Sequence, residues 1–143
     1  MRRVQEPCVK KAKMIGNITE YKVTVAQSDI DELNHVNNAV YLKWVQTATL
    51  QHWHLFAPEQ AIQSHVWVAL RHKIRYLRPA FFNELLSVQV QLEKVRGACS
   101  FYKTNILRDG EALVKVDSCW VYLNSETRKP ERISHELLAH FSK

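Results

Sequence analysis

Residues 39–58 read AVYLKWVQTATLQHWHLFAP, and this stretch decides the fold. It contains no glycine, and its only proline is Pro58, so nothing interrupts a helix before that residue. Apolar side chains recur along it at the spacing of one helix face: Val40, Tyr41, Trp44, Val45, Ala48, Leu55 and Phe56. We predict one long helix over residues 39–56, whose wide apolar face needs a sheet to cover it.

The chain on both sides of this helix has the two-residue period of β-strands. Before it, Tyr21, Val23 and Val25 alternate with polar residues, which predicts a first strand. After it we predict strands over residues 66–76, 84–95, 98–108 and 111–123. Within residues 66–76, one alternating set is expected to share a face: Val66, Val68, Leu70, His72, Ile74 and Tyr76.

Two tight turns connect the last three of these strands. Arg96-Gly97 and Asp109-Gly110 are typical of hairpin turns, so residues 84–123 are predicted to form an antiparallel three-strand meander. Pro130 precedes a short terminal helix. A strand, a long helix, four strands and a small helix together predict the α+β class, with the helix packed on an antiparallel sheet.

Length and composition favour one folded domain. The chain has 143 residues, of which 46% are hydrophobic and 24% charged, which is typical of a soluble domain. Residues 1–17 are basic and lack a period, so we predict a basic N-terminal arm, with the domain over residues 18–143. Three cysteines without a Cys-x-x-Cys pair favour a cytoplasmic protein over a disulfide framework. No apolar run is long enough for membrane insertion, and the net charge of +6 favours an anionic partner.

The densest polar cluster, SDIDELNHVNN at residues 28–38, lies between the first strand and the long helix. Helix capping explains one asparagine and at most one carboxylate. With Asn37 as the cap, the backbone N–H groups of Asn38, Ala39 and Val40 are expected to be free to bind an oxyanion. Asp31 is close enough in sequence to face them across a bound carbonyl group.

This cluster, continued through Tyr41 and Trp44, resembles the signature of the hotdog-fold thioesterases. Both the 4-hydroxybenzoyl-CoA thioesterase-like branch and the plant acyl-carrier-protein thioesterases show it. The resemblance implies a single hotdog domain, in which an antiparallel sheet wraps a long central helix. It also implies hydrolysis of an acyl thioester of coenzyme A or acyl carrier protein. Because similar enzymes hold the coenzyme across a subunit boundary, a homodimer or homotetramer is expected.

The resemblance also implies roles for individual residues. Asp31 would be the catalytic carboxylate, as a general base for water or as a nucleophile, with His35 and Asn38 as further catalytic groups. The plant enzymes have an asparagine where this chain has Leu33, which favours an aspartate assisted by helix amides over their triad. Asn34 replaces a glycine of the benzoyl-CoA branch and tolerates similar left-handed geometry. This chemistry needs no metal and no cofactor.

Substrate contacts are predicted along the helix and on a basic face. Asn37, Tyr41 and Trp44 are expected to contact the substrate, with packing in the core as the alternative for Tyr41 and Trp44. Arg96 belongs to a set of cations expected to bind the phosphates of coenzyme A or an acidic carrier protein: Arg71, Lys73, Arg75, Lys94, Arg96 and Lys103. The alternative for this set is an ordinary solvated sheet face.

Other functions stay open at this stage. The fold could bind an acyl-CoA without turnover, or act as a hydratase or dehydratase. The basic face could bind nucleic acid, with Trp67, Tyr76 and Tyr102 as stacking groups. Templates for serine hydrolases and metal sites find no support, because Ser64 sits in no Gly-x-Ser-x-Gly motif and His52 and His54 point apart on a helix.

Overall fold

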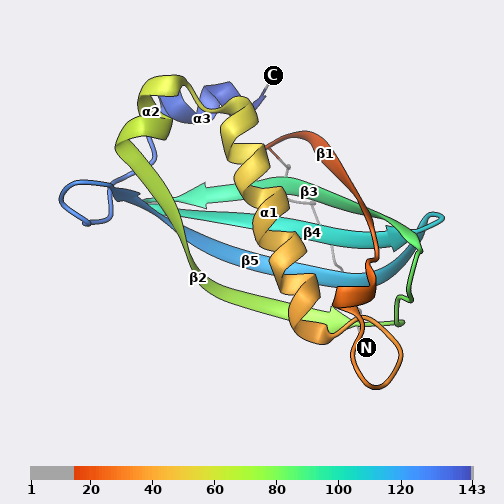
Figure 1. The fold of residues 1–143 in the computed structure, drawn as a ribbon. Helices are drawn as coiled ribbons and strands as arrows, with labels where there is room; N and C mark the ends of the chain where they lie inside the picture. Colours follow the sequence, from red (N-terminus) through yellow and green to blue (C-terminus); the bar gives the residue numbers. More distant parts are fainter. Residues whose placement is uncertain (1–14, 143) are drawn as a thin grey trace, which may run out of the picture.

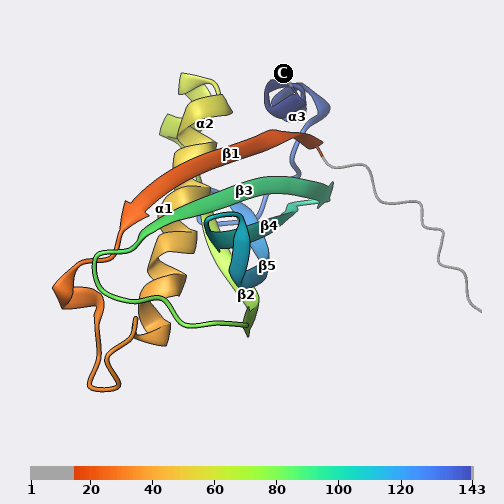
Figure 2. The ribbon, with the colours of Figure 1, turned by 90° about the vertical axis from the view of Figure 1, so that its right-hand side faces the viewer.

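The computed structural model describes residues 15–142 and contains a five-stranded antiparallel sheet with one long helix against it. The strands are β1 (Ile15–Thr24), β2 (His65–Tyr76), β3 (Leu85–Arg96), β4 (Cys99–Arg108) and β5 (Glu111–Asn124), arranged in the order β1-β3-β4-β5-β2. Helix α1 (Asn38–Phe56) lies across one face of this sheet (Figures 1 and 2). The predicted α+β class and the helix boundaries are confirmed, with α1 beginning one residue earlier than expected.

The meander of β3, β4 and β5 is also confirmed. Asp109 and Gly110, with φ of 51° and 82°, form the second of its turns. Positive φ at both central residues is the geometry that matches the twist of a hairpin. Local sequence chemistry therefore sets this turn, whereas the register beyond it shifts at Ile106/Leu107 and, between β3 and β4, at Leu92/Lys94.

The single alternation expected over residues 66–76 is wrong. The register of β2 against β5 shifts between Ala69 and Arg71, which leaves Leu70 as an extra residue in a β-bulge. Before the bulge Trp67 is buried and Val68 is 42% exposed, and beyond it His72 faces Ser118 of β5. The bulge changes which set of β2 residues faces the helix.

At the N-terminal side, β1 begins at Ile15, inside the predicted arm. Gly16 has a φ of 75°, and a Cβ atom there would lie 2.0 Å from the carbonyl oxygen of Phe141, so only glycine fits this close approach. The rest of the predicted arm lies outside the described residues.

Two short helices cover the end of the sheet near the C-terminus of α1 (Figure 1). Helix α2 (Glu59–Ser64), which the sequence interpretation missed, follows Pro58, and α3 (His135–Ala139) lies near the end of the chain. The core fills the space between α1 and the sheet and includes Val45, Ala48, Leu86, Val88, Ile106 and Val114. None of the helices in residues 15–142 is both long and apolar enough to cross a bilayer.

Candidate active site

The segment between β1 and α1 closes on itself to form a small loop. Ile30 and Val36 pair in an antiparallel bridge, and the Asp31 N–H donates to the carbonyl oxygen of His35 at 3.1 Å. Asn34 has a φ of 70°, the left-handed geometry expected for it, and this turns the chain back. Asp31 and His35 consequently lie opposite each other where the loop closes.

The Asp31 carboxylate is held by its own loop. Its Oδ1 accepts a hydrogen bond from the Leu33 N–H at 2.9 Å and lies 4.0 Å from Nδ1 of His35. The Asp31 and His35 side chains are 24% and 32% exposed, so water reaches both. A partly accessible carboxylate in a fixed orientation is suited to activating water or attacking a carbonyl group.

Helix α1 starts as the capping argument predicts, but with fewer free donors. Oδ1 of Asn37 accepts from the Ala39 N–H at 2.9 Å, and the Asn37 carbonyl oxygen accepts from the Val40 N–H at 2.9 Å. The expectation that these two N–H groups are free is therefore wrong. Only the Asn38 N–H, of the three, has no hydrogen-bond partner within residues 15–142.

A cavity of about 220 Å³ lies beside this helix start. Its lining combines the motif with the chain that follows β2: His35, Val36, Asn38, Tyr41, Tyr76, Leu77, Arg78 and Pro79. Of the predicted site residues, His35, Asn38 and Tyr41 thus share one cavity, whereas Asp31 is not part of its lining and lies 4.0 Å from His35. Asn37 does not line the cavity, and its side-chain oxygen caps α1.

The two predicted aromatic contacts play structural parts. Tyr41 is 2% exposed, and its hydroxyl oxygen accepts the Ala80 N–H at 3.1 Å. Burial raises the pKa of Tyr41, which keeps the hydroxyl neutral. Trp44 is packed edge-on against the Tyr41 ring at 5.5 Å and does not line the cavity.

Residues 76–79 are the part of the cavity that sequence reasoning missed as a site. Tyr76 donates from its hydroxyl to the carbonyl oxygen of Asn38 at 3.5 Å, and its ring lies 5.8 Å from that of Tyr41. Pro79 predicts the end of a strand. No local signal says that the following loop packs against the start of α1.

Arg96 is not brought to this cluster. Leu85, at the start of β3, pairs with Thr24 near the motif, and Arg96 ends the same strand. Eleven residue steps of extended chain separate them by about 36 Å. Within one chain Arg96 therefore lies near the opposite end of the sheet from Asp31.

Two of the remaining cations of the predicted basic face, Lys94 and Lys103, interact with neighbouring side chains. Arg71, Lys73, Lys94 and Lys103 line a cavity of about 290 Å³ that also contains Glu93. Nζ of Lys103 lies 2.6 Å from Asp117, which raises the pKa of this lysine. Lys94 lies 5.1 Å from the centre of the Phe101 ring. Of the three aromatic residues predicted to stack on nucleic acid, Trp67 and Tyr102 are only 7% and 1% exposed, and only Tyr76, at 45%, is open to solvent.

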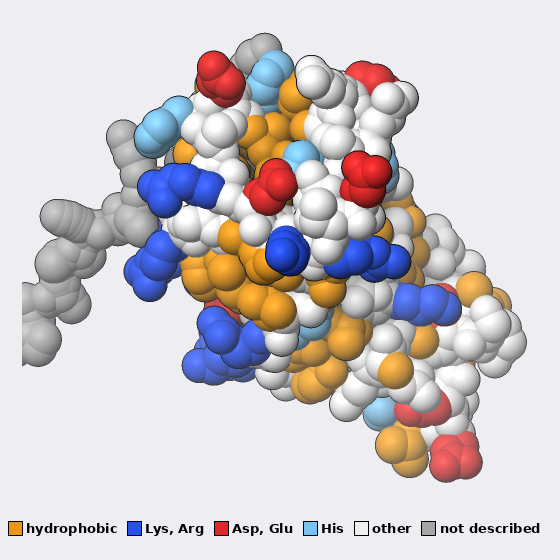
Figure 3. All heavy atoms as spheres, turned by 90° about the vertical axis from the view of Figure 1, so that its left-hand side faces the viewer, with side chains coloured by type: hydrophobic (Ala, Val, Ile, Leu, Met, Phe, Trp, Pro, Cys, Tyr) orange, Lys and Arg blue, Asp and Glu red, His pale blue; other side chains and the backbone are white. Residues whose placement is uncertain are grey.

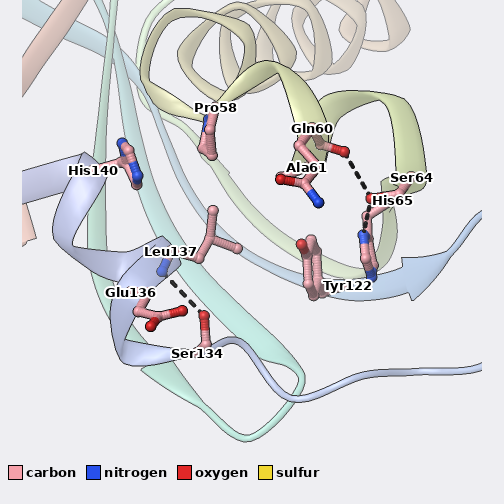
Figure 4. Close-up of a pocket in the computed structure, with 10 residues that line it drawn as sticks. All are labelled: Pro58, Gln60, Ala61, Ser64, His65, Tyr122, Ser134, Glu136, Leu137 and His140. Atoms are coloured by element: carbon pink, nitrogen blue, oxygen red, sulfur yellow. Dashed lines mark hydrogen bonds between the residues drawn. The ribbon is translucent and has the colours of Figure 1, made fainter.

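A further cavity, of about 390 Å³, lies between α2, α3 and β5 and contains none of the predicted site residues (Figure 4). Ser64 Oγ lies 2.7 Å from Nδ1 of His65, whose Nε2 lies 2.6 Å from Glu131. Ser64 donates its proton to the carbonyl oxygen of Gln60 at 2.8 Å. These contacts tie the end of α2 to Glu131, and Ser64 sits in no Gly-x-Ser-x-Gly motif.

Metal ligands do not gather anywhere in the part of the chain that the structure describes, where no three His, Cys, Asp or Glu side chains are placed to hold an ion. The buried histidine His52 serves the core instead. Its Nδ1 lies 3.0 Å from the Tyr102 hydroxyl, its ring stacks on Phe141, and burial lowers its pKa to about 4.

Comparison with known proteins places this geometry in a family. A long-chain acyl-CoA thioesterase of Escherichia coli K12, FadM, is 27% identical over 120 residues, which cover 81% of this chain and 91% of that protein. A predicted thioesterase from Bacillus stearothermophilus superposes with a TM-score of 0.77 at 20% identity, covering 87% of this chain and 94% of the other. A Thermus thermophilus thioesterase crystallised with coenzyme A and zinc gives 0.75 at 23% identity, with 85% and 90% covered.

The family model described as the thioesterase-like superfamily matches residues 25–141, which include the polar loop, the helix α1 and the strands β2 to β5. The chain therefore belongs to the thioesterase-like superfamily.

Proposed function

We propose that this chain hydrolyses acyl-CoA thioesters to a free acid and a thiol, with Asp31 as the catalytic carboxylate. The observation that carries the proposal is the placement of the Asp31 carboxylate, which the Leu33 N–H orients and which lies 4.0 Å from His35, a residue of the cavity wall. The same cavity has space for an acyl group and is lined by Asn38, whose N–H at the start of α1 has no partner among residues 15–142. The name of the E. coli relative, a long-chain acyl-CoA thioesterase, supports the choice of substrate.

In the proposed reaction, the Asn38 N–H and the positive end of α1 stabilise negative charge on the thioester oxygen. Asp31 either takes a proton from water as that water attacks the carbonyl carbon, or attacks the carbon itself to give a mixed anhydride that water then hydrolyses. In both routes the carbon–sulfur bond breaks. The electron pair leaves with sulfur, which is protonated to the free thiol.

His35 is proposed to contact the substrate or the attacking water rather than to share a proton with Asp31. Its ring lines the cavity, but its Nδ1 is 4.0 Å from the carboxylate. The walls formed by Tyr76, Leu77 and Pro79 would contain the part of the acyl group nearest the sulfur. Tyr41 and Trp44 would shape this wall from behind.

The basic face is proposed to bind the phosphates of the coenzyme A nucleotide. All of its cations are exposed, and all except Lys103 make no ion pair among residues 15–142, so they are free to meet an anion. Of these, Arg71, Lys73 and Lys94 line the cavity of about 290 Å³. Substitution of Lys73 by glutamine should raise KM for acyl-CoA but leave KM for an acyl-N-acetylcysteamine thioester, which lacks the nucleotide. The same cations suit an acidic carrier protein, and comparison of acyl-CoA with acyl-carrier-protein substrates separates the two.

A second copy of the chain is proposed to pack on β2, giving a homodimer or, by further association, a homotetramer. Strand β2 ends the sheet, so one side of its backbone lacks a partner strand in a single chain. Val66, Val68 and Leu70 on it are 40%, 42% and 59% exposed. Figure 3, viewed from the side on which β2 lies in Figure 1, shows hydrophobic side chains in one continuous area, with Lys and Arg side chains at its margin. Arg96 would reach a substrate only through such an assembly.

Thiol release from a panel of short-chain, long-chain and aromatic acyl-CoAs tests the proposed reaction. Asp31→Asn and Asp31→Ala should each remove turnover while the protein stays folded. Glu32→Gln, which changes an exposed carboxylate next to Asp31, should retain it. The signal from the protein's own thiols, Cys8, Cys99 and Cys119, has to be subtracted.

The alternative is an acyl-CoA-binding protein of the same fold without turnover. It would bind the panel, release no thiol, and bind equally well after Asp31→Asn. If the Asp31 variants release thiol as fast as the wild-type protein, the chain hydrolyses thioesters but the proposed mechanism is wrong. Hydration of an enoyl-CoA double bond, the remaining alternative, would appear as loss of enoyl absorbance without thiol release.

A further inference from the structure

The loop of residues 77–84, between β2 and β3, forms one wall of the cavity at Asn38 and has no regular secondary structure. Figure 2 shows it running beside the segment that precedes α1. Its start is fixed to β5, where Leu77 and Arg78 both donate their N–H groups to the carbonyl oxygen of Leu113. The position of residues 79–84 depends on hydrogen bonds to segments far away in the sequence.

Ala80, at the centre of this loop, connects it to the candidate active site. Its carbonyl oxygen accepts the Val36 N–H at 2.9 Å, and its own N–H donates to the Tyr41 hydroxyl at 3.1 Å. Ala80 is fully buried and Val36 is 1% exposed. A shift of this loop therefore moves the residue between His35 and Asn37, as well as the first turn of α1.

Arg108, at the end of β4, holds both ends of the same loop. Its Nη1 donates to the carbonyl oxygen of Pro79 at 3.2 Å and to Oε1 of Glu84 at 2.8 Å. The same Glu84 oxygen accepts the Phe81 N–H at 2.8 Å. Arg108 and Glu84 are 23% and 28% exposed, so solvent screens this pair only partly. Arg108 itself lines no part of the cavity.

We infer that Arg108 is a positioning residue for the candidate active site. Through Pro79, Glu84 and Ala80 it fixes the cavity wall and the approach of the motif to α1. A planar guanidinium presents several donors in a fixed geometry, which a lysine ammonium does not reproduce. The catalytic part of this inference rests on the proposed thioesterase function, whereas the coupling of Arg108 to Val36 and Ala80 does not.

Amide hydrogen exchange measured by NMR tests the coupling without any substrate. Arg108→Gln should speed exchange at Val36 and Ala80 by about tenfold or more, with a smaller effect in Arg108→Lys, while the amides of Val88 and Val90 in β3 keep their rates. Arg132→Gln changes an exposed arginine without a hydrogen-bonded side chain among the described residues, and serves as the matched control. Unchanged exchange at both Val36 and Ala80 in Arg108→Gln would overturn the inference.

Steady-state kinetics test the catalytic consequence. Arg108→Gln should raise KM for acyl-CoA about tenfold with a smaller change in kcat, because the wall against the acyl group moves. Partial unfolding would lower kcat per total protein and leave KM unchanged, so that result would assign Arg108 to stability alone. If the wild-type protein releases no thiol from any substrate, the proposed function fails, while the exchange rates still decide the coupling.

Discussion

Oδ1 of Asp31 lies 4.0 Å from Nδ1 of His35, although the two residues face each other where their loop closes. This distance is longer than a direct hydrogen bond, and the same oxygen already accepts the Leu33 N–H. Nδ1 of His35 lies nearer the Val36 carbonyl oxygen, at 3.4 Å. The two side chains therefore make no direct hydrogen bond with each other, and in the reaction that we propose the reactive oxygen belongs to Asp31.

His35→Ala is therefore expected to cost far less activity than Asp31→Asn. The histidine variant should lower kcat/KM by about tenfold, and the aspartate variant by about a thousandfold or more, because in the proposed reaction only Asp31 takes part in bond making. Thiol release under identical conditions gives both ratios, with His54→Gln on the exposed side of α1 as the control. Equal losses would mean that Asp31 and His35 act as one unit.

Loss of the α1 cap should lower stability by a predictable amount. Asn37→Ala removes the acceptor of the Ala39 N–H and should reduce the free energy of unfolding by about 1 kcal/mol. Asn37→Asp keeps an acceptor oxygen and should stay close to wild type. Urea denaturation measures both, and an alanine variant as stable as wild type would contradict the capping role.

Tyr41→Phe should destabilise the protein although it removes only one oxygen atom. The Ala80 N–H would lose its acceptor in a buried position, at a cost of about 1–3 kcal/mol. Tyr21→Phe is the matched control, because the Tyr21 hydroxyl makes no hydrogen bond among residues 15–142. Similar unfolding free energies for the two variants would show that the Tyr41–Ala80 contact contributes little.

His52 should make the fold sensitive to acid. Burial lowers the pKa of His52 to about 4, whereas the unfolded chain takes up this proton near the ordinary value of 6.5. Between these values the unfolded state binds more protons, so stability falls by about 3 kcal/mol as the pH drops through this window. Burial also lowers the pKa of His72, so this residue too lowers the stability of the fold as the pH drops.

Denaturation curves across this pH window check the assignment. His52→Phe should flatten the dependence of the unfolding free energy on pH, whatever its effect at neutral pH. An unchanged slope in His52→Phe would place the acid sensitivity in other groups.

A charge placed on β2 should weaken the proposed assembly. Val68→Glu introduces a carboxylate into the exposed apolar part of that strand, where a second copy would have to bury it. Light scattering coupled to size exclusion should show a shift toward the monomer. Ile18→Glu places the same change at an exposed apolar residue of β1, the opposite edge of the sheet, and should keep the wild-type mass. A dimer that persists in Val68→Glu would move the interface elsewhere.

The features that were predictable are those set by neighbours in sequence. The long helix, its Asn37 cap, the Asn34 turn and the hairpins of the meander depend on apolar spacing, side-chain acceptors and positive φ, which a few adjacent residues determine. The same holds for the loop that brings Asp31 opposite His35. Helix α2 is the local element that was missed, because six residues are too few to show a helical period.

Tertiary packing decided the rest. The bulge at Leu70 depends on how β2 pairs with β5, so the residues themselves do not reveal which set faces the helix. Ala80 and Arg108 carry no motif, and they matter only because the loop after β2 packs against the start of α1. The sequence by itself determined the helix, its cap, the meander and the loop that closes at Asp31 and His35, since these follow from contacts a few residues apart. Only the tertiary structure decided which wall faces that loop, because hydrogen bonds between segments far apart in the sequence, Val36 to Ala80 and Arg108 to Pro79, build it.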